Sequence, residues 1–140
     1  MSALSKTFVL FLAVLFVPLV SAGDKSAATD TKVLSTGDGT YWVRYQIEPA
    51  TIVLNQTFSL QVAIFQDEAL TKPARDITLA VDGRMPQHRH GMNTEPVVTQ
   101  SEPGRFEVKG MLFHMVGRWQ LMFDITRDGE TVRAQTALDL

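Results

Sequence analysis

The stretch RWQLMFDITRDGETVRAQTAL, residues 118–138, decides the fold class of this chain. Apolar and polar residues alternate on both sides of Asp128-Gly129, and Asp-Gly between two alternating runs is the strongest short-range signal for a β-hairpin. The expected inward faces of the two strands are Trp119, Leu121, Phe123 and Ile125, and Val132, Ala134, Thr136 and Leu138. An apolar face on each strand must be covered by another apolar layer, so the hairpin belongs to a two-layered fold.

The same two-residue period recurs upstream, where further strands are predicted over residues 41–48, 57–65, 76–82, 97–100 and 105–113. Their expected inward-facing residues are Val43, Tyr45, Ile47, Phe58, Leu60, Val62, Ile64, Phe106 and Val108. Turn residues lie between most of these strands, a break in strand structure is predicted over residues 83–96, and no segment has a convincing helical period. The sequence therefore predicts an all-β, immunoglobulin-like β-sandwich of about seven strands, with a small barrel as the alternative.

The first 22 residues have the three parts of a secretory signal peptide. Lys6 carries the positive charge, residues 7–20 form an almost unbroken apolar run, and Val20-Ser21-Ala22 predicts cleavage after Ala22. The alternative is an uncleaved membrane anchor, but a run of 14 residues is shorter than the ~20 that a membrane-spanning helix needs. No Cys follows the run, which excludes a lipid-anchored lipoprotein.

Cleavage leaves 118 of the 140 residues, and we expect this mature chain to have no membrane span. Residues 23–39 are small, polar and aperiodic, which is typical of a flexible leader, and residues 40–140 form the predicted domain. The chain has no Cys and therefore no disulfide. For a small exported domain this favours a bacterial protein, either periplasmic or secreted.

Charge and motif content argue against several functional classes. The formal net charge is −2, with both signs scattered along the chain. There is no basic stripe for nucleic acid and no basic amphipathic helix for a membrane surface. There is also no Cys nucleophile, no serine in a nucleophile elbow, no HExxH zinc motif and no phosphate-binding loop. We therefore expect that the protein is not an enzyme.

Histidine and methionine are clustered in one part of the sequence. The mature chain has three His and five Met, and all eight lie between residues 85 and 122. His88, His90 and Met92 are two residues apart, so in an extended backbone their side chains point to the same side. His114 and Met115 precede a glycine that we expect to mark a turn. Loops at one end of a sandwich lie close in space, so the two segments are expected to combine.

The donor types in this cluster predict a copper site. Thioether sulfur suits Cu(I), whereas imidazole binds Cu(I), Cu(II) and zinc, and a His and Met set without Cys suits an oxidising compartment. The candidate metal ligands are His88, His90, Met92, Met85, His114 and Met115, and a copper ion is the predicted cofactor. The alternative is structural: His-x-His also occurs in solvated loops, and Met often fills cores.

Two motifs in the same region resemble the YtkA-like family of small exported bacterial domains. They are GRMPQHRHGM at residues 83–92 and GMLFHMVGRW at residues 110–119, with Gly104-Arg105-Phe106 between them. The resemblance covers residues 57–140 and implies an immunoglobulin-like fold, and some members or neighbours are linked to copper handling or respiratory-complex assembly. The family's motif positions are Met85, His88, His90, Met92 and Met115. His114 lies outside the motif, and Val116 stands where the family usually has Pro.

These observations leave two functions open, with a weaker third. The first is a copper-binding carrier or buffer. The second is a non-metal interaction or assembly module of the cell envelope, which would dock on a partner protein through the same loops or add a partner strand to an exposed sheet edge. The third is pH sensing, because His88, His90 and Arg89 would all be positive in acid and could open the loop.

Overall fold

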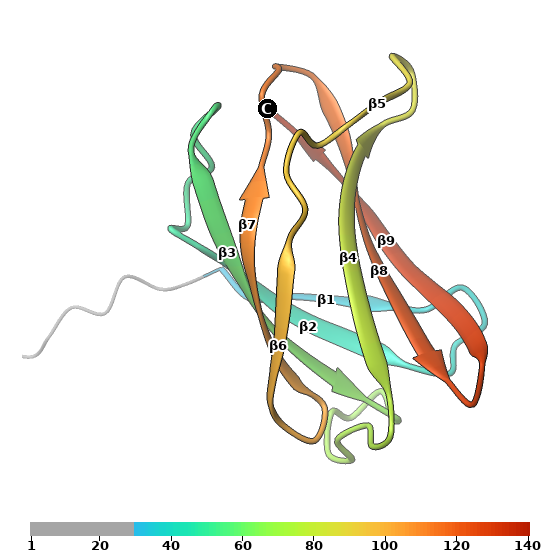
Figure 1. Ribbon diagram of the computed structural model, residues 1–140. Coiled ribbons are helices and arrows are strands. Elements are labelled where there is room, and N and C mark those ends of the chain that lie inside the picture. The colour runs from blue at the N-terminus through green and yellow to red at the C-terminus, as the bar shows by residue number, and fades with distance from the viewer. Residues whose placement is uncertain (1–29) are drawn as a thin grey trace, which may run out of the picture.

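The computed structural model describes residues 30–140, and these residues form two antiparallel β-sheets without a helix (Figure 1). One sheet contains β1 (Lys32–Ser35), β2 (Trp42–Glu48), β3 (Thr57–Phe65), β6 (Val97–Glu102) and β7 (Arg105–Leu112). The other contains β4 (Thr78–Met85), β5 (His90–Gly91), β8 (Arg118–Arg127) and β9 (Glu130–Asp139). The predicted all-β sandwich is confirmed.

The strand order identifies the type of sandwich. The order is β1-β2-β3-β7-β6 in one sheet and β5-β4-β8-β9 in the other. When β2 is lettered A and β5 is treated as the additional edge strand C′, the sheets read A-B-E-D and C′-C-F-G. This is the arrangement of immunoglobulin-like domains. The chain crosses between the sheets after β3, β5 and β7, and the β4–β5 turn and the β7–β8 loop lie at the same end (Figure 1).

The hydrophobic core has the composition that the alternation predicts. The inward-facing residues expected in β2, β3 and β7 are at most 9% exposed, and those expected in β8 are all 0% exposed. Aromatic rings join the two sheets: Tyr45 of β2 lies 5.1 Å from Phe123 of β8, and Phe113, directly after β7, lies 4.4 Å from Trp119 of β8, measured between ring centroids. Burial of each such side chain contributes roughly 1.5–3 kcal/mol, which accounts for a stable domain without disulfides.

Strand β4 is longer than predicted. The sequence predicts that the strand ends before Gly83. The strand instead continues to Met85, and Gly83 pairs with Leu121 of β8. A Cβ atom at Gly83 would lie 2.5 Å from Cε1 of Phe113 and 3.2 Å from Sδ of Met92. The absence of a side chain at Gly83 therefore allows Phe113 and Met92 to pack closely against β4, and the glycine does not mark a turn. The break predicted over residues 83–96 is therefore wrong for residues 83–85.

A short strand also lies inside the segment that the sequence predicts to be a flexible leader. β1 pairs with β2 from Lys32↔Tyr45 to Ser35↔Trp42, so ordered chain begins before residue 40. Four residues with half-buried Leu34 as their apolar anchor are too few to give a periodic pattern. The predicted signal peptide and residues 23–29 lie outside the described residues. Within residues 30–140, no helix is long and apolar enough to span a membrane.

Candidate metal centre

His88 and His90 lie in the hairpin that joins β4 to β5. Residues 86–89 form its turn, in which the His88 N–H donates a hydrogen bond to the Met85 carbonyl at 3.1 Å and Arg89 adopts a left-handed φ of 55°. His90 pairs directly with Met85. Paired residues of antiparallel strands project from the same face of a sheet, so His90 projects from the same face as the buried Met85. His90 is nevertheless exposed, because it lies at the end of the sheet, past the part that the other sheet covers.

His114 and Met115 lie in the loop between β7 and β8, which is held in place by backbone and side-chain hydrogen bonds. Gly117, at φ 125°, exchanges two backbone hydrogen bonds with Leu140, at 2.8 and 3.1 Å. The Trp119 indole N–H donates to the Met115 carbonyl at 2.9 Å. Both His114 and Met115 are half-buried. The loop is therefore fixed to the C-terminus and to a fully buried core residue.

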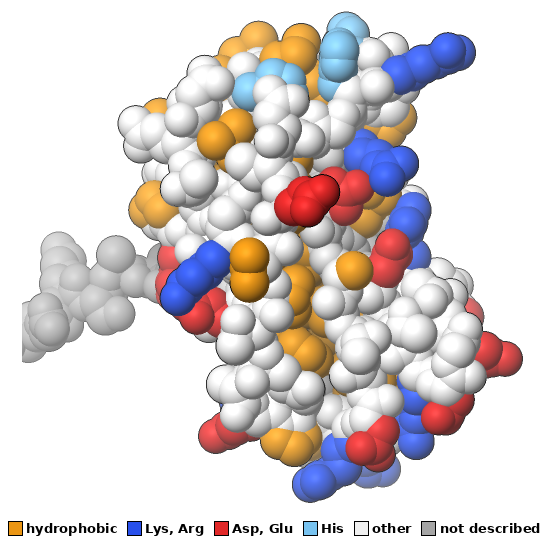
Figure 2. All heavy atoms as spheres, in the orientation of Figure 1, with side chains coloured by type: hydrophobic (Ala, Val, Ile, Leu, Met, Phe, Trp, Pro, Cys, Tyr) orange, Lys and Arg blue, Asp and Glu red, His pale blue; other side chains and the backbone are white. Residues whose placement is uncertain are grey.

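The hairpin and the loop meet where Met85 packs beneath Gly117. A Cβ atom at Gly117 would lie 2.8 Å from Cε of Met85, so this contact depends on the glycine. The ring centroids of His88 and His90, both in the hairpin, lie 6.5 Å apart, and those of His90 and His114, across the two segments, also lie 6.5 Å apart. Histidine side chains gather at this end of the molecule, among hydrophobic ones (Figure 2). The fold thus brings the two segments together.

The methionines divide into half-buried and fully buried groups. Met92 and Met115 are half-buried and pack against the edge of the core, so their thioethers lie at the boundary between core and solvent. Met85 is 1% exposed and packs as a core residue, as does Met111, whereas Met122 is buried on the opposite face of β8. Of the three methionines predicted as ligands, the structure therefore places Met92 and Met115 at the accessible margin and Met85 in the interior.

His114 has an unusual environment for an imidazole. Its ring meets the Trp119 ring edge-on at a centroid distance of 5.5 Å, and Trp119 in turn stacks on Phe113 at 4.4 Å. Its Nδ1 atom is buried and has no hydrogen-bond partner among the described residues. Leaving a buried polar atom unpaired costs about 1–3 kcal/mol, so an imidazole is a poor choice for packing alone.

The distances between the rings limit how these residues can hold an ion. With metal–nitrogen distances of about 2.0–2.1 Å, two imidazoles on one ion have ring centres roughly 6.4 Å apart in a linear arrangement and roughly 5.2 Å apart in a tetrahedral one. The observed 6.5 Å is close to the linear value. With the side chains as they lie, no three His, Asp or Glu residues within 30–140 form a group that could hold a metal. The spacing therefore matches a two-coordinate ion between two of these rings when their nitrogens face each other, and a tetrahedral ion requires the rings to move closer together.

Charged groups near the histidines have both signs. An open depression of about 780 Å³ beside the hairpin is lined by His90 and Met92, together with Arg84, Arg89 and Glu95. Arg84 is paired with Asp82 at 2.8 Å. No carboxylate joins the histidine row itself among the described residues. Such a donor set, rich in nitrogen and sulfur and poor in oxygen, suits a soft ion such as Cu(I) better than a hard divalent one.

The sequence identified the donors but missed the parts that support them. Trp119 was expected to act as a core anchor, yet it also contacts the His114 ring and holds the Met115 carbonyl. The glycine pattern predicts a break at Gly83, whereas Gly83 lies inside β4 and packs against Phe113. The signal for Trp119 is its spacing, since a side chain four or five residues after the two donors can reach back across a short loop. No spacing rule would have indicated the contact between Met85 and Gly117.

Comparisons with known proteins support the fold alone. No protein-family profile matches the chain, and no curated protein matches it. Among solved structures, a DUF4426 family protein from Pseudomonas aeruginosa PAO1 is similar, with a TM-score of 0.51 and 10% sequence identity. The match covers 79% of this chain and 94% of that one. At this identity the likeness concerns the arrangement of strands and not the residues of a site.

Proposed function

We propose that the chain is an exported copper-binding protein, a carrier or buffer of the bacterial cell envelope. The observation that carries the proposal is the row of imidazoles formed by His88, His90 and His114, with neighbouring centroids 6.5 Å apart. Half-buried Met92 and Met115 border the row. The proposal includes binding without catalysis, export by the predicted signal peptide, and membership of the YtkA-like family, which the motifs at residues 83–92 and 110–119 support.

Cu(I) is the oxidation state that the geometry favours. Two imidazoles opposite each other suit a linear two-coordinate ion, and a thioether is a soft third ligand that Cu(I) accepts readily. Cu(II) prefers a tetragonal set of nitrogen and oxygen donors, which would require a carboxylate or a third coplanar imidazole. Met85 is excluded from the proposed ligands because its side chain is buried in the core.

Anaerobic competition titrations with Cu(I), and calorimetry with Cu(II), on residues 23–140 test this function. We expect one Cu(I) per chain, bound at least tenfold more tightly than Cu(II). The double variant His88→Ala/His90→Ala should lose at least a hundredfold in Cu(I) affinity, whereas Gln87→Ala, an exposed change in the same turn, should keep it. Equal affinity in the double variant and the unaltered chain would refute the proposal.

An interaction module is the second candidate, and the edges of the sheets favour it. β5 pairs with β4 at only two positions, Arg84↔Gly91 and Met85↔His90, which leaves most of the outer edge of β4 without a strand partner. An exposed edge can accept a strand from another protein. Affinity capture from a bacterial envelope extract tests this function. Recovery of no specific partner by a chain that binds copper would count against it.

A further inference from the structure

A second polar site lies on the outer face of the five-stranded sheet, where two arginines face each other across an alanine. In the strand register, Arg44 of β2 pairs with Ala63 of β3, and Ala63 pairs with Arg105 of β7. The three side chains therefore share one face. Neighbouring strands are about 4.8 Å apart, so the two arginine backbones are separated by roughly 10 Å, within reach of one small group between them.

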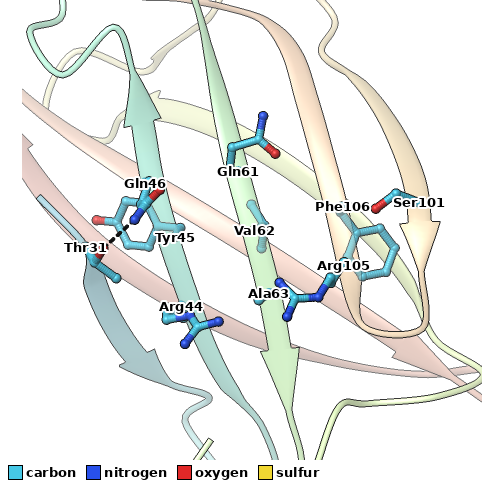
Figure 3. A pocket seen from close by; sticks show the side chains of 10 residues that line it. All are labelled: Thr31, Arg44, Tyr45, Gln46, Gln61, Val62, Ala63, Ser101, Arg105 and Phe106. Carbon is cyan, nitrogen blue, oxygen red and sulfur yellow. Dashed lines mark hydrogen bonds between the residues drawn. The ribbon is translucent and has the colours of Figure 1, made fainter. Parts of the chain in front are cut away.

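The small side chain of Ala63 leaves a hollow of about 270 Å³ in this row. Figure 3 shows Arg44 and Arg105 on either side of Ala63, with the Arg105 guanidinium next to Ala63. Ala63 is 7% exposed because the longer side chains cover it. The hollow thus has an apolar floor and two cationic walls.

The two guanidinium groups keep donors available. Arg44 lies over the ring of Phe65, with its Cζ 5.1 Å from the ring centroid, and is in no ion pair among the described residues. Arg105 uses Nε in a pair with Glu102 at 3.3 Å, and both side chains are more than half exposed. A guanidinium carries five N–H donors, so these contacts leave most of them unused. The contact with the Phe65 ring positions the Arg44 side chain but leaves its guanidinium without an anionic partner within residues 30–140.

Neutral polar groups complete the wall of the hollow. Gln46 donates to Thr31 through Nε2 at 2.5 Å, and Gln61 donates to Glu48 through Nε2 at 3.3 Å. One N–H of each amide is thus engaged, and the two amide oxygens can accept hydrogen bonds from a hydroxylated ligand. Ser101 adds a hydroxyl on the β6 side of the hollow. Glu48 and Glu102 lie outside the lining, so the charged groups that line the hollow are the two arginines.

We propose that this hollow binds the phosphate group of a small hydroxylated phosphoester. One guanidinium fork satisfies a planar carboxylate, whereas a tetrahedral phosphate offers oxygens to two forks on opposite sides. The amide oxygens and Ser101 would then contact hydroxyl groups next to the phosphate. Such a group occurs in free glycerol phosphates and in phospholipid headgroups. The site is independent of the copper proposal, because it lies on a different sheet and uses none of the same residues.

Nuclear magnetic resonance titrations on residues 23–140 at constant ionic strength test the site. With glycerol 3-phosphate and inorganic phosphate as probes, we expect saturable shifts of the Arg44 and Arg105 Nε–H signals and of the Ala63 amide. Arg44→Gln and Arg105→Gln should each weaken binding at least tenfold. Arg127→Gln, which removes the same charge from β8 in the other sheet, should leave binding unchanged.

The controls make either outcome decisive. Arg105 is exposed, so Arg105→Gln keeps the fold and gives an answer even if Arg44→Gln unfolds the chain. Sedimentation with phosphatidylglycerol vesicles separates the two sources of the phosphate: loss of vesicle binding in Arg105→Gln identifies the headgroup, and absence of vesicle binding with retained glycerol 3-phosphate binding identifies the free molecule. Shifts that do not saturate, or that are equal in Arg105→Gln, would overturn the proposal.

Discussion

His114 is the residue at which stability and the proposed function oppose each other. Its ring contributes apolar contact with Trp119, but its buried Nδ1 has no partner among the described residues. A phenyl ring would keep the contact and remove the unpaired atom. An unpaired buried nitrogen costs about 1–3 kcal/mol, so His114 is the position at which a phenyl ring is the informative substitution.

Replacing His114 by Phe is expected to leave the free energy of unfolding unchanged or to raise it by about 1 kcal/mol, because a buried unpaired nitrogen is removed. Cu(I) affinity should fall at least tenfold. Denaturant unfolding and competition titration measure the two effects. A variant that is less stable by more than about 1 kcal/mol and binds Cu(I) as before would show that His114 is a structural residue.

At the scale of elements, the turn between β6 and β7 packs directly against the backbone of neighbouring segments. Gly104 has φ 72°, and a Cβ atom there would lie 2.7 Å from the Ile64 carbonyl oxygen and 3.0 Å from backbone atoms of Ala74. The Gly104 carbonyl accepts a hydrogen bond from the Ile64 N–H at 2.7 Å. The turn thus joins β3, the following loop and the β6–β7 hairpin without room for a side chain.

Gly104→Ala should lower the free energy of unfolding by about 3 kcal/mol, because backbone strain adds to a clash with atoms that cannot move aside. Gly39 is a matched control, since it has the same φ of 72° with nothing within 4 Å of a Cβ atom. Gly39→Ala should therefore cost about 1 kcal/mol, the strain alone. Equal losses in denaturant unfolding of the two variants would contradict this account of the turn.

The β1 strand depends on the turn that follows it. Asp38 accepts hydrogen bonds from the hydroxyls of Thr36 and Thr40, at 2.6 and 2.5 Å, and these bonds lower the pKa of its carboxyl group to about 2, from a usual value of 3.8. Because the pKa is depressed in the folded state, the stabilisation is present above pH 3.8 and is lost as the pH falls towards 2.

We therefore expect β1 to separate from β2 in acid before the rest of the sandwich unfolds. Hydrogen exchange at the Leu34 amide, corrected for the intrinsic rate, should accelerate between pH 4 and 2 in the unaltered chain. In Asp38→Asn, protection at Leu34 should be lower and should not change over this interval. An unaltered chain whose protection at Leu34 stays constant down to pH 2 would show that the turn does not hold β1.

For the whole molecule, the sequence predicted the sandwich because side-chain alternation is a local property. Trp119, Leu121 and Phe123 share a face by parity alone, and the structure confirms them as core residues. The misassigned positions depend on contacts between distant segments. Gly83 continues a strand because Phe113 packs against it, and β1 forms because β2 supplies its partner. Neither effect is visible within a short window of sequence.

The same distinction applies to the candidate site. Parity places His90 and Met92 together, and the type of donor predicts a soft ion. The 6.5 Å spacing between His90 and His114 instead joins two segments far apart in the chain, which also meet where Met85 lies against Gly117. A long-range contact therefore decides whether two donor segments make one site. Met85, a predicted ligand, is buried because it shares the core-facing side of β4 with Leu79 and Val81.

The most direct test of the central claim is whether one ion engages both segments. Nitrogen-15 spectra of the three imidazoles during anaerobic Cu(I) titration of residues 23–140 make that measurement. We predict that the ring signals of His90, from the hairpin, and His114, from the loop, shift together and saturate at one ion per chain. A His114 signal that stays unchanged while His88 and His90 saturate, or three signals that follow separate stoichiometries, would contradict the account.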